Sequence, residues 1–417
     1  MYLIKPEYKS EITVNLPSSK SLTHRSLILG SLNRGSTTIR EKLVSEDTTI
    51  TLEALKNLGA HWVEKDGVIR NNTILGANPG SEIFLGNSGS SARFLLPLAA
   101  FCKKPVKYYG VDRLHERPFN ELLDSMMMLG IDLSRTNDGL PVVVYPSKVA
   151  GGSISFGSLP SSQVVTSLMI SGLWMEKPLT IELPHNTPSL PYITMTYKLM
   201  KQLGLEVQFE QDTIFVANEP PENDWNLKIE KDYSAASYWV IYGLINDAKV
   251  ILPGLTLPSL QGDHKILEIA ELAGGNVMLY DDRTEITGRI SKGINLDCGA
   301  VPDLVPALAV LAMFAPEKSA LSNIRHLEYK ESNRVAAIQQ NISALGGSTE
   351  YQNGSLVIHP AKNYKSAEIK TFDDHRIAMS FAVAGCKIPE ITIDKPECVQ
   401  KSYPEFWNDF THWEKRQ

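Results

Sequence analysis

The stretch SSKSLTHRSLIL, residues 18–29, decides the fold: a polar start runs directly into an apolar segment with helical spacing. Segments of the same design recur along the chain as NSGSSARFLLPLA, PSSQVVTSLMISGL, DYSAASYWVIYGL, VPDLVPALAVLAM and DDHRIAMSFAVAG. One marker residue can be taken in each copy, in order Ser21, Ser90, Ser162, Ser234, Asp303 and His375. The markers are 69, 72, 72, 69 and 72 residues apart. A constant period is typical of a repeated structural unit, so the sequence predicts six units.

A second marker follows the first in each of five units: an amphipathic helix that ends in glycine. The copies are LEALKNLGAHW, LLDSMMMLGIDL, LMKQLGLEVQF, ILEIAELAGGNVML and IQQNISALGGSTEY. Glycine at that place supplies the left-handed residue that commonly ends a helix. Short strand patterns such as EIFLG, LTIELP and KVILPG lie between the helices. One unit is therefore predicted to hold strands and two helices, with no sixth copy of the glycine-terminated helix at the chain end.

The first helix of each unit is apolar almost all round, which indicates a helix inside a domain. Three such helices enclosed by sheets would make one domain, and six would make two. The length of 417 residues also favours more than one domain. A solenoid is the alternative, although solenoid repeats usually run about 20 to 50 residues.

Composition excludes several classes of protein. Lysine and arginine number 41 against 47 aspartates and glutamates, and the net charge of −6 argues against binding nucleic acid by bulk charge. The longest apolar stretch, 305–315, is shorter than the roughly 18 residues that span a membrane. The charged N-terminus does not resemble a signal peptide, and four scattered cysteines form no disulfide or zinc pattern. A cytoplasmic protein with reduced thiols is expected.

Basic residues gather at or near the polar helix starts. They are Lys20, Arg25, Arg93, His375 and Arg376, with Arg117, Lys330, Arg334 and Lys401 in short segments between them. A helix N-terminus presents unpaired N–H groups and a partial positive charge, so it attracts anions. A solvated surface is the ordinary alternative for any one of these residues. Their recurrence at helix starts favours anionic ligands for the group.

Three carboxylates accompany the basic residues: Asp303 at a helix start, Glu331 in KESNR and Asp374 in DDHR. Each has a structural alternative, since an aspartate often caps a helix and Glu331 has the i,i+3 spacing of a pair with Arg334. The sequence contains no HExxH, GxSxG, GxGxxG or GxxxxGK[ST]. It therefore gives no support to a zinc protease, a serine hydrolase, a dinucleotide-binding protein or a P-loop enzyme.

Seven motifs, in order along the chain, resemble those of the EPSP synthases within the enolpyruvyl transferase family. They are LPSSKSLTHR, LGNSGSSARF, HERPF, SSQ, YKESNR, DDHRIAM and KSYPEF. The resemblance implies a two-domain inside-out α/β barrel with three repeats in each domain. It places an upper domain at 18–229 and a discontinuous lower domain at 1–17 plus 230–417, with crossings near Pro17 and near 228–232.

This family transfers the enolpyruvyl group of phosphoenolpyruvate to the 5-hydroxyl of shikimate 3-phosphate through a tetrahedral intermediate, in the cleft between the domains, and releases phosphate. Matched by motif, the residues implied to bind shikimate 3-phosphate are Lys20, Ser21, Arg25, Ser161, Ser162, Gln163, Ser189, Asp303 and Lys330. Those implied to bind phosphoenolpyruvate are Lys20, Gly89, Arg93, Arg117, Gln163, Arg334, Arg376 and Lys401. A side chain at Gly89 would occupy space beside the small substrate.

The resemblance also implies roles in the chemistry. Asp303 is expected to act as base and Glu331 as acid, with Lys20 taking part in the proton transfers. His375 and Asp374 are expected to orient their neighbours. Neither a metal nor an organic cofactor is implied. The expected partners are the two small-molecule substrates, without nucleic acid or membrane, and the expected state is a monomer.

Several positions depart from the usual family pattern, and none is a residue assigned to chemistry. They are Ser18 for a glycine, Ser90 and Ser91 for a Thr-Ala pair, Phe94 for a proline, Asn333 for an aspartate and Leu190 for a lysine. Gly89 predicts inhibition by glyphosate, but Phe94 could shift the helix that carries Gly89 and Arg93.

Two other functions are weighed against this one. The sister enzyme that acts on UDP-N-acetylglucosamine typically has Lys-Asn at Lys20-Ser21 and a reactive loop cysteine, for which Cys102 is the only candidate by position. A non-catalytic or RNA-processing protein on a related repeat fold would need a basic face or a nucleotide-attached histidine. The sequence pI near 5.9 speaks against the basic face.

Overall fold

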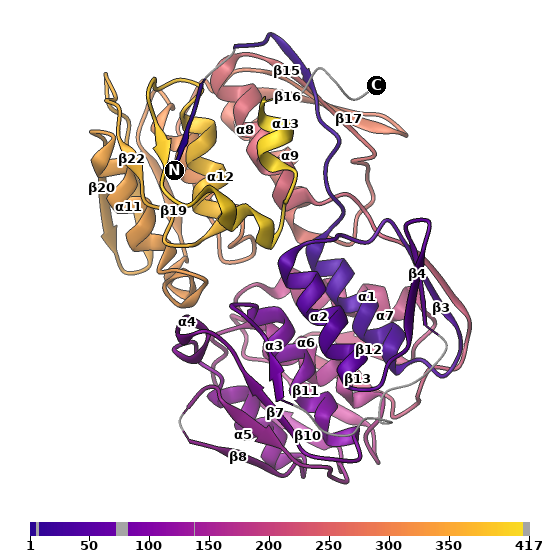
Figure 1. The fold of residues 1–417 in the computed structure, drawn as a ribbon. Coiled ribbons are helices and arrows are strands. Elements are labelled where there is room, and N and C mark those ends of the chain that lie inside the picture. Colours follow the sequence, from indigo (N-terminus) through magenta and orange to yellow (C-terminus); the bar gives the residue numbers. More distant parts are fainter. Residues whose placement is uncertain (6–7, 72–81, 137, 412–417) are drawn as a thin grey trace. The chain divides into compact units, whose positions relative to one another are not determined.

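The structure is a computed structural model that describes residues 1–5, 8–71, 82–136 and 138–411. The chain divides into two compact units, one of residues 18–229 and one of residues 1–17 with 230–417 (Figure 1). Each unit is described by itself below.

The unit of residues 18–229 contains three four-stranded sheets. Their strands, in sheet order, are β14 (Trp225–Lys228), β3 (Thr37–Arg40), β5 (Val68–Asn71) and β4 (Trp62–Lys65); β6 (Glu82–Phe84), β7 (Val106–Tyr109), β9 (Val142–Val144) and β8 (Leu133–Arg135); and β10 (Gly152–Ser155), β11 (Leu179–Glu182), β13 (Thr213–Val216) and β12 (Val207–Glu210). The first helix of each repeat is α1 (Lys20–Leu32), α3 (Gly89–Leu95) or α6 (Ser162–Gly172). The second is α2 (Glu46–Asn57), α5 (Asn120–Met128) or α7 (Leu190–Gln202), and η1 (Pro97–Phe101) and α4 (Asp112–His115) are short connecting helices.

The other unit contains two four-stranded sheets and one three-stranded sheet. Their strands, in sheet order, are β16 (Gly275–Leu279), β17 (Arg283–Gly288), β15 (Lys249–Pro253) and β2 (Glu11–Thr13); β18 (Asn295–Asp297), β19 (Ser319–Ser322), β21 (Ser355–His359) and β20 (Ser348–Gln352); and β1 (Tyr2–Leu3), β23 (Thr392–Ile393) and β22 (Glu368–Ile369). Its first helices are α8 (Tyr233–Asn246), α10 (Val305–Met313) and α12 (His375–Ala384). Its other helices are α9 (Ile266–Ala273), α11 (Arg334–Ala344), α13 (Phe406–Thr411), η2 (Gly262–Lys265), η3 (Arg325–Tyr329) and η4 (Pro396–Lys401).

Every four-stranded sheet has the same pairing. In the third repeat, β10 and β11 are parallel, with Gly152 opposite Leu179, and α6 joins them. The β12–β13 hairpin then pairs antiparallel through β13, with Val216 opposite Leu179. A parallel pair needs a long crossover, which α3, α6 and α10 supply in the repeats whose paired strands follow one another along the chain. The predicted unit of strands and two helices is confirmed.

Two strands exchange sheets where the chain passes from one unit to the other. β2 precedes α1 along the chain but pairs with β15, with Glu11 opposite Lys249. β14 precedes α8 but pairs with β3, with Trp225 opposite Thr37. Each of these sheets therefore takes its leading strand from a distant part of the sequence.

The last repeat is completed by the N-terminus. β1 pairs antiparallel with β23, with Tyr2 opposite Ile393, in the place that a hairpin strand takes in the other sheets. A short helix, α13 (Phe406–Thr411), lies at the place of the second helix in this repeat. No glycine follows α13 in the sequence, in keeping with the prediction of no sixth glycine-terminated copy.

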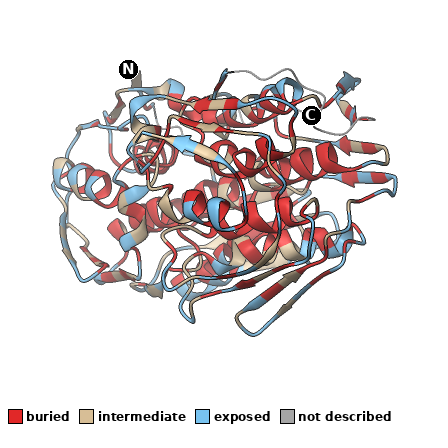
Figure 2. Cartoon of the chain, turned by 90° about the horizontal axis from the view of Figure 1, so that it is seen from below, coloured by how far each residue is buried: buried red, intermediate tan, exposed pale blue. Residues whose placement is uncertain are grey.

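The first helices form the cores, as their all-round apolar pattern predicted. All residues of α1 from Leu22 to Leu32 are buried, as are all nine of α10 and all ten of α12. In the second unit α8, α10 and α12 pack on one another. Figure 2 shows buried colour along the inner helices, whereas many strands alternate between buried and exposed residues. The polar side chains at the start of α12, His375 and Arg376, are therefore buried next to an apolar interior.

Candidate active site

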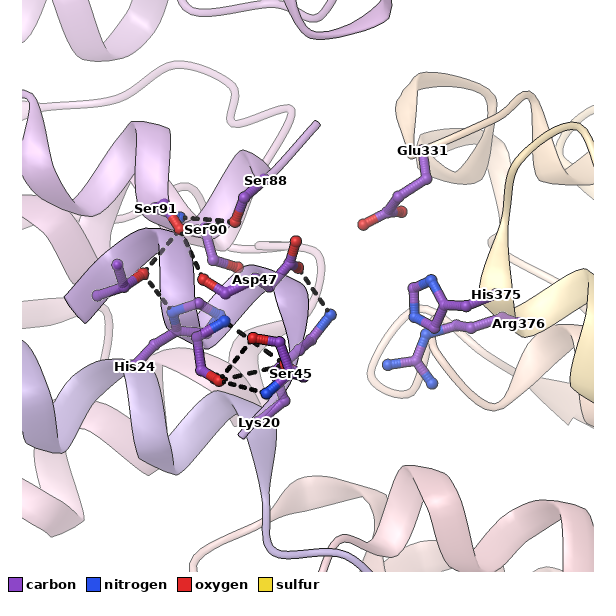
Figure 3. Close-up of polar contacts among 12 residues, drawn as sticks. Lys20, His24, Ser45, Asp47, Ser88, Ser90, Ser91, Glu331, His375 and Arg376 are labelled. Carbon is purple, nitrogen blue, oxygen red and sulfur yellow. Dashed lines mark hydrogen bonds and ion pairs between the residues drawn. The ribbon is translucent and has the colours of Figure 1, made fainter. Parts of the chain in front are cut away.

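Lys20 is the first residue of α1, and Ser19 caps that helix by accepting a hydrogen bond from the Leu22 N–H. The Lys20 Nζ lies 3.2 Å from the Asp47 Oδ2 (Figure 3). Asp47 is in the first turn of α2, whose capping residue is Ser45. Sequence analysis missed Asp47, because an acidic residue just after a capping serine is common in purely structural helices.

A buried chain of hydroxyls joins α1, α2 and α3. The Thr51 Oγ1 lies 2.8 Å from the His24 Nδ1 and 2.7 Å from the Ser91 Oγ. The Ser91 Oγ lies 2.7 Å from the Ser88 Oγ, and Ser88 caps α3 (Figure 3). Ser91 is one of the departures from the family pattern. These hydrogen bonds fix α2, which carries Asp47, against the start of α3.

Arg25 is a buried cation that neutral groups surround. Its Nε donates to the Thr196 Oγ1 at 2.7 Å, and its Nη1 donates to the Ser21 carbonyl at 2.9 Å. Its Nη2 donates to the Tyr192 carbonyl at 3.0 Å and to the Thr166 Oγ1 at 3.4 Å. Burial lowers the pKa of Arg25 to about 10. Among the described residues no carboxylate pairs with it. Such a charge is costly to bury and is therefore suited to receive an anion.

These bonds connect Arg25 to the two helices that three predicted serines begin or precede. Thr166 is in the second turn of α6, which Ser161 caps and Ser162 begins. Thr196 and Tyr192 belong to α7, and Ser189 precedes that helix with a positive φ of 57°. Arg25 thus joins the helices whose N-termini carry Ser161, Ser162 and Ser189.

Arg93 connects α3 with α6. Its Nη1 donates to the Gln163 Oε1 at 3.1 Å, and its Nη2 donates to the Pro118 carbonyl at 2.8 Å. The Gln163 Nε2 in turn donates to the Ser90 Oγ at 2.9 Å. Ser90, another departure from the family pattern, therefore helps to orient the predicted ligand Gln163.

Gly89 leaves room for the guanidinium of Arg117. A Cβ built at residue 89 would lie 2.5 Å from the Arg117 Cζ, closer than van der Waals contact allows. Arg117 is itself buried. From the sequence, a side chain at residue 89 was expected to occupy space beside the substrate. In the structure, the group that lies in this space is the guanidinium of Arg117.

In the other unit, Asp303 bridges two arginines. Its Oδ1 lies 2.9 Å from the Arg334 Nη1 and its Oδ2 lies 2.7 Å from the Arg376 Nη2. The residue at the N-cap of α10 is Leu304, and no side chain caps that helix, so the capping alternative for Asp303 was wrong. Burial raises the pKa of the Asp303 carboxyl, but the positive charges of Arg376, Arg334 and Lys330 lower it by more. The pKa of Asp303 therefore lies below its ordinary value.

Arg334 binds two further carboxylates. Its Nε lies 2.8 Å from the Asp374 Oδ2 and its Nη2 lies 2.7 Å from the Glu331 Oε2. The i,i+3 pair that sequence analysis offered as a structural alternative for Glu331 is therefore present. Burial lowers the pKa of Arg334, but Asp374, Glu331 and Asp303 raise it above its ordinary value. Arg334 is thus a permanent cation held by three carboxylates.

Asp374 also organises the start of α12. It caps the helix by accepting a hydrogen bond from the Arg376 N–H at 2.9 Å, and it accepts another from the Ser332 Oγ at 3.1 Å. His375, the first residue of α12, is buried, with its Nδ1 3.8 Å from the Asp374 Oδ1. Sequence analysis missed Ser332.

Lys401 ends η4, which packs against α12, and it is buried. Lys330 lies in the connection between η3 and α11 and is half-buried.

The predicted residues therefore fall into two groups, each within one compact unit. The group in the unit of residues 18–229 is Lys20, Ser21, Arg25, Gly89, Arg93, Arg117, Ser161, Ser162, Gln163 and Ser189. The group in the other unit is Asp303, Lys330, Glu331, Arg334, Asp374, His375, Arg376 and Lys401.

Within the described ranges, no set of three or more His, Cys, Asp or Glu side chains has a geometry that could hold a metal ion. No helix in that part of the chain is long and apolar enough to cross a membrane.

Comparison with known proteins assigns the chain to a family. A family model described as EPSP synthase (3-phosphoshikimate 1-carboxyvinyltransferase) matches residues 4–410. The chain belongs to the EPSP synthase family. A relative named 3-phosphoshikimate 1-carboxyvinyltransferase from Syntrophobacter fumaroxidans is 33% identical over 419 residues, covering 98% of each chain. One of the same name from Methanospirillum hungatei is 33% identical and covers 94% of each chain.

The likeness extends to the fold. The solved EPSP synthase from Acinetobacter baumannii superposes with a TM-score of 0.80 at 24% identity, covering 97% of this chain and 96% of that one. The predicted two-domain inside-out α/β fold is confirmed.

Proposed function

We propose that this EPSP synthase family member transfers the enolpyruvyl group of phosphoenolpyruvate to the 5-hydroxyl of shikimate 3-phosphate. The products are 5-enolpyruvylshikimate 3-phosphate and phosphate. Family membership over nearly the whole chain supports the reaction. Both substrates are multiply anionic, so an acidic protein must supply fixed cations locally, and the two groups of buried cations meet that need.

Shikimate 3-phosphate binds to the group around Arg25 in this proposal. The observation that carries it is the burial of the Arg25 guanidinium among neutral acceptors, beside helices that begin at serines. Ser161, Ser162 and Ser189 hold the 3-phosphate, while Gln163 contacts the ring. Lys20, Ser21, Asp303 and Lys330 complete the set. A phosphate at helix N-termini gains from their unpaired N–H groups, and each charge-assisted contact is worth about 1.5 to 3 kcal/mol.

Phosphoenolpyruvate binds to the remaining cations in this proposal. They are Lys20, Arg93, Arg117, Arg334, Arg376 and Lys401, with Gly89 and Gln163 beside them. Fixed guanidinium groups need no reorganisation as charge develops, so they stabilise the departing phosphate.

The chemistry proceeds by addition and elimination. Asp303 accepts the proton of the 5-hydroxyl while the hydroxyl oxygen forms a bond to C2 of phosphoenolpyruvate. Glu331 donates a proton to C3, which becomes a methyl group. In the second step the bond between C2 and the phosphate oxygen breaks, and phosphate leaves with the proton that Asp303 had accepted. A proton returns from C3 to Glu331, and the C2–C3 double bond re-forms. Lys20 assists these proton transfers, and His375 and Asp374 orient Arg376 and Arg334.

The arginine partners of Asp303 have a consequence for its basicity. The pKa of Asp303 lies below the ordinary value while Arg376 and Arg334 pair with it, and a carboxylate of low pKa is a weak base. When the anionic groups of phosphoenolpyruvate bind these arginines, the carboxylate shares its partners. Its pKa then rises, so the base is activated when the second substrate is present.

The test is release of phosphate measured with each substrate alone and with both. Release that requires shikimate 3-phosphate and phosphoenolpyruvate together is expected. Release with UDP-N-acetylglucosamine in place of shikimate 3-phosphate would assign the sister reaction. The sister enzyme typically has a reactive cysteine, which must be a thiolate, and Cys102 is the only candidate by position. Burial raises the pKa of Cys102 to about 11, which disfavours the sister reaction.

The proposal includes a cytoplasmic monomer as the working form. Light scattering coupled to gel filtration should give the mass of one 46.2 kDa chain. A mass twice as large would contradict it.

A further inference from the structure

Helix α3 carries an arginine and a phenylalanine at adjacent positions, and each takes part in a contact between a guanidinium and a ring. The Cζ of Arg25 lies 5.2 Å from the centroid of the Phe94 ring, over its face. The Cζ of Arg93 lies 4.5 Å from the centroid of the Phe119 ring. Adjacent residues of a helix point about 100° apart. Phe94 therefore contacts Arg25 of α1, while Arg93 points in another direction and contacts Phe119.

Arg25 has particular need of the ring. Its N–H groups bond to neutral oxygens in the plane of the guanidinium, and no carboxylate among the described residues pairs with it. The face of an aromatic ring carries partial negative charge, and a buried contact of this kind is worth more than an exposed one. The Phe94 ring therefore stabilises the charge and limits tilting of the guanidinium out of its hydrogen-bonding plane.

We propose that Phe94 and Phe119 are positioning residues for substrate binding, each for a different arginine. Phe94 holds Arg25 for shikimate 3-phosphate, and Phe119 holds Arg93 for phosphoenolpyruvate. This inference rests on the proposed function for the identity of the two ligands. It gives Phe94, a departure from the family pattern, a role in this chain.

Ordinary core packing is the competing explanation, because Phe94 is 1% exposed and Phe119 is fully buried. Packing depends on shape, whereas attraction between the cation and the ring depends on electron density at the ring face. Packing also predicts that both substrates are affected together. The two explanations therefore differ in two measurable ways.

The first measurement compares Phe94→Met with Phe119→Met by calorimetry. Phe94→Met should weaken binding of shikimate 3-phosphate by about 3- to 30-fold and leave phosphoenolpyruvate binding, measured with shikimate 3-phosphate saturating, within about twofold. Phe119→Met should do the reverse. Phe406→Met, at a fully buried ring in the core of the other unit, is the control and should lower thermal stability without changing either affinity.

The second measurement keeps the shape of the side chain. Phenylalanine with one, two or three ring fluorines is incorporated at residue 94, which withdraws electron density from the ring face in steps. Affinity for shikimate 3-phosphate should fall at each step while the midpoint of thermal unfolding stays constant. Equal affinity across the series, or equal loss for both substrates in both methionine variants, would overturn the inference. Failure of the wild-type chain to bind shikimate 3-phosphate would instead overturn the proposed function and the inference together.

Discussion

The Asp303 Oδ2 lies 2.7 Å from the Arg376 Nη2, although 73 residues separate the two in the sequence. They occupy equivalent places in successive repeats, just before α10 and at the start of α12, and these helices pack on each other. Asp303 does not cap its own helix, and each of its carboxylate oxygens pairs with an arginine. Its two oxygens are thus held by fixed guanidinium groups, which orient the proposed base.

Asp303→Ala and Glu331→Ala should each lower kcat by about 100-fold or more, because a positioned acid or base contributes roughly 10²- to 10⁴-fold. Binding of the two substrates, measured by calorimetry, should change far less. An equal loss in kcat and in affinity would make the residue a binding group and contradict its assignment to proton transfer.

Lys20→Met should be the most costly single change at the site, because Lys20 is assigned to both substrates and to the proton transfers. Asp47→Asn should lower kcat/KM by about 10-fold or less, since it removes the carboxylate charge 3.2 Å from the Lys20 Nζ and leaves Lys20 in place. The matched control is Lys56→Met, which removes an exposed ion pair with Glu53 on α2 and should leave kcat/KM unchanged. A larger effect for Asp47→Asn than for Lys20→Met would refute the assigned order.

Arg25→Met should weaken binding of shikimate 3-phosphate by about 10- to 150-fold, the equivalent of losing one charge-assisted contact. The midpoint of thermal unfolding should stay the same or rise, because the change removes a buried charge that lacks a carboxylate partner. Calorimetry and thermal unfolding of the same variant test both parts. Strong destabilisation with unchanged affinity would show that Arg25 serves the fold alone.

Asp374→Ala should destabilise the chain by about 3 to 5 kcal/mol, because it leaves the fully buried Arg334 with an unsatisfied Nε and removes the cap of α12. Urea unfolding measures the loss. Asp282→Ala, at an exposed pair with Arg283, is the control and should cost less than about 1 kcal/mol. Equal losses in the two variants would contradict a structural role for the buried pair.

Asp263 gives the stability of the chain a distinct pH dependence. It is buried on η2 and accepts a hydrogen bond from Ser234. Burial, followed by the charges of Asp303 and Asp232, raises the pKa of Asp263 to about 7, while Ser234 and Arg376 oppose the rise. Between pH 4 and 7 the folded state retains a proton that the unfolded state loses, so this residue makes stability fall as pH rises through that window.

Asp263→Asn, which resembles the protonated carboxyl, should therefore be more stable than the wild type at pH 8 by up to roughly 4 kcal/mol, the value of a three-unit pKa difference. The gain should vanish at pH 4. Thermal unfolding of both proteins across this range gives the difference directly. A difference that does not vary with pH would show that Asp263 does not retain its proton.

Much of the site could be predicted from the sequence because its residues stand in short local motifs at helix starts. Arg25, Gln163 and Arg334 were proposed in this way. Asp47, Thr51 and Ser332 were missed, since each is an ordinary polar residue whose importance comes from a neighbour distant in the sequence.

The sequence by itself determined the sixfold repeat, the strands and helices of each unit and the burial of the first helices. These depend on hydrophobic spacing, capping residues and glycine, all of which act within a few residues. Only the tertiary structure decided that β2 and β14 exchange sheets, that Arg117 fills the space at Gly89, and that Asp303 bridges two arginines instead of capping α10. Those features depend on which distant segments meet, and the local pattern of residues carries no information about that choice.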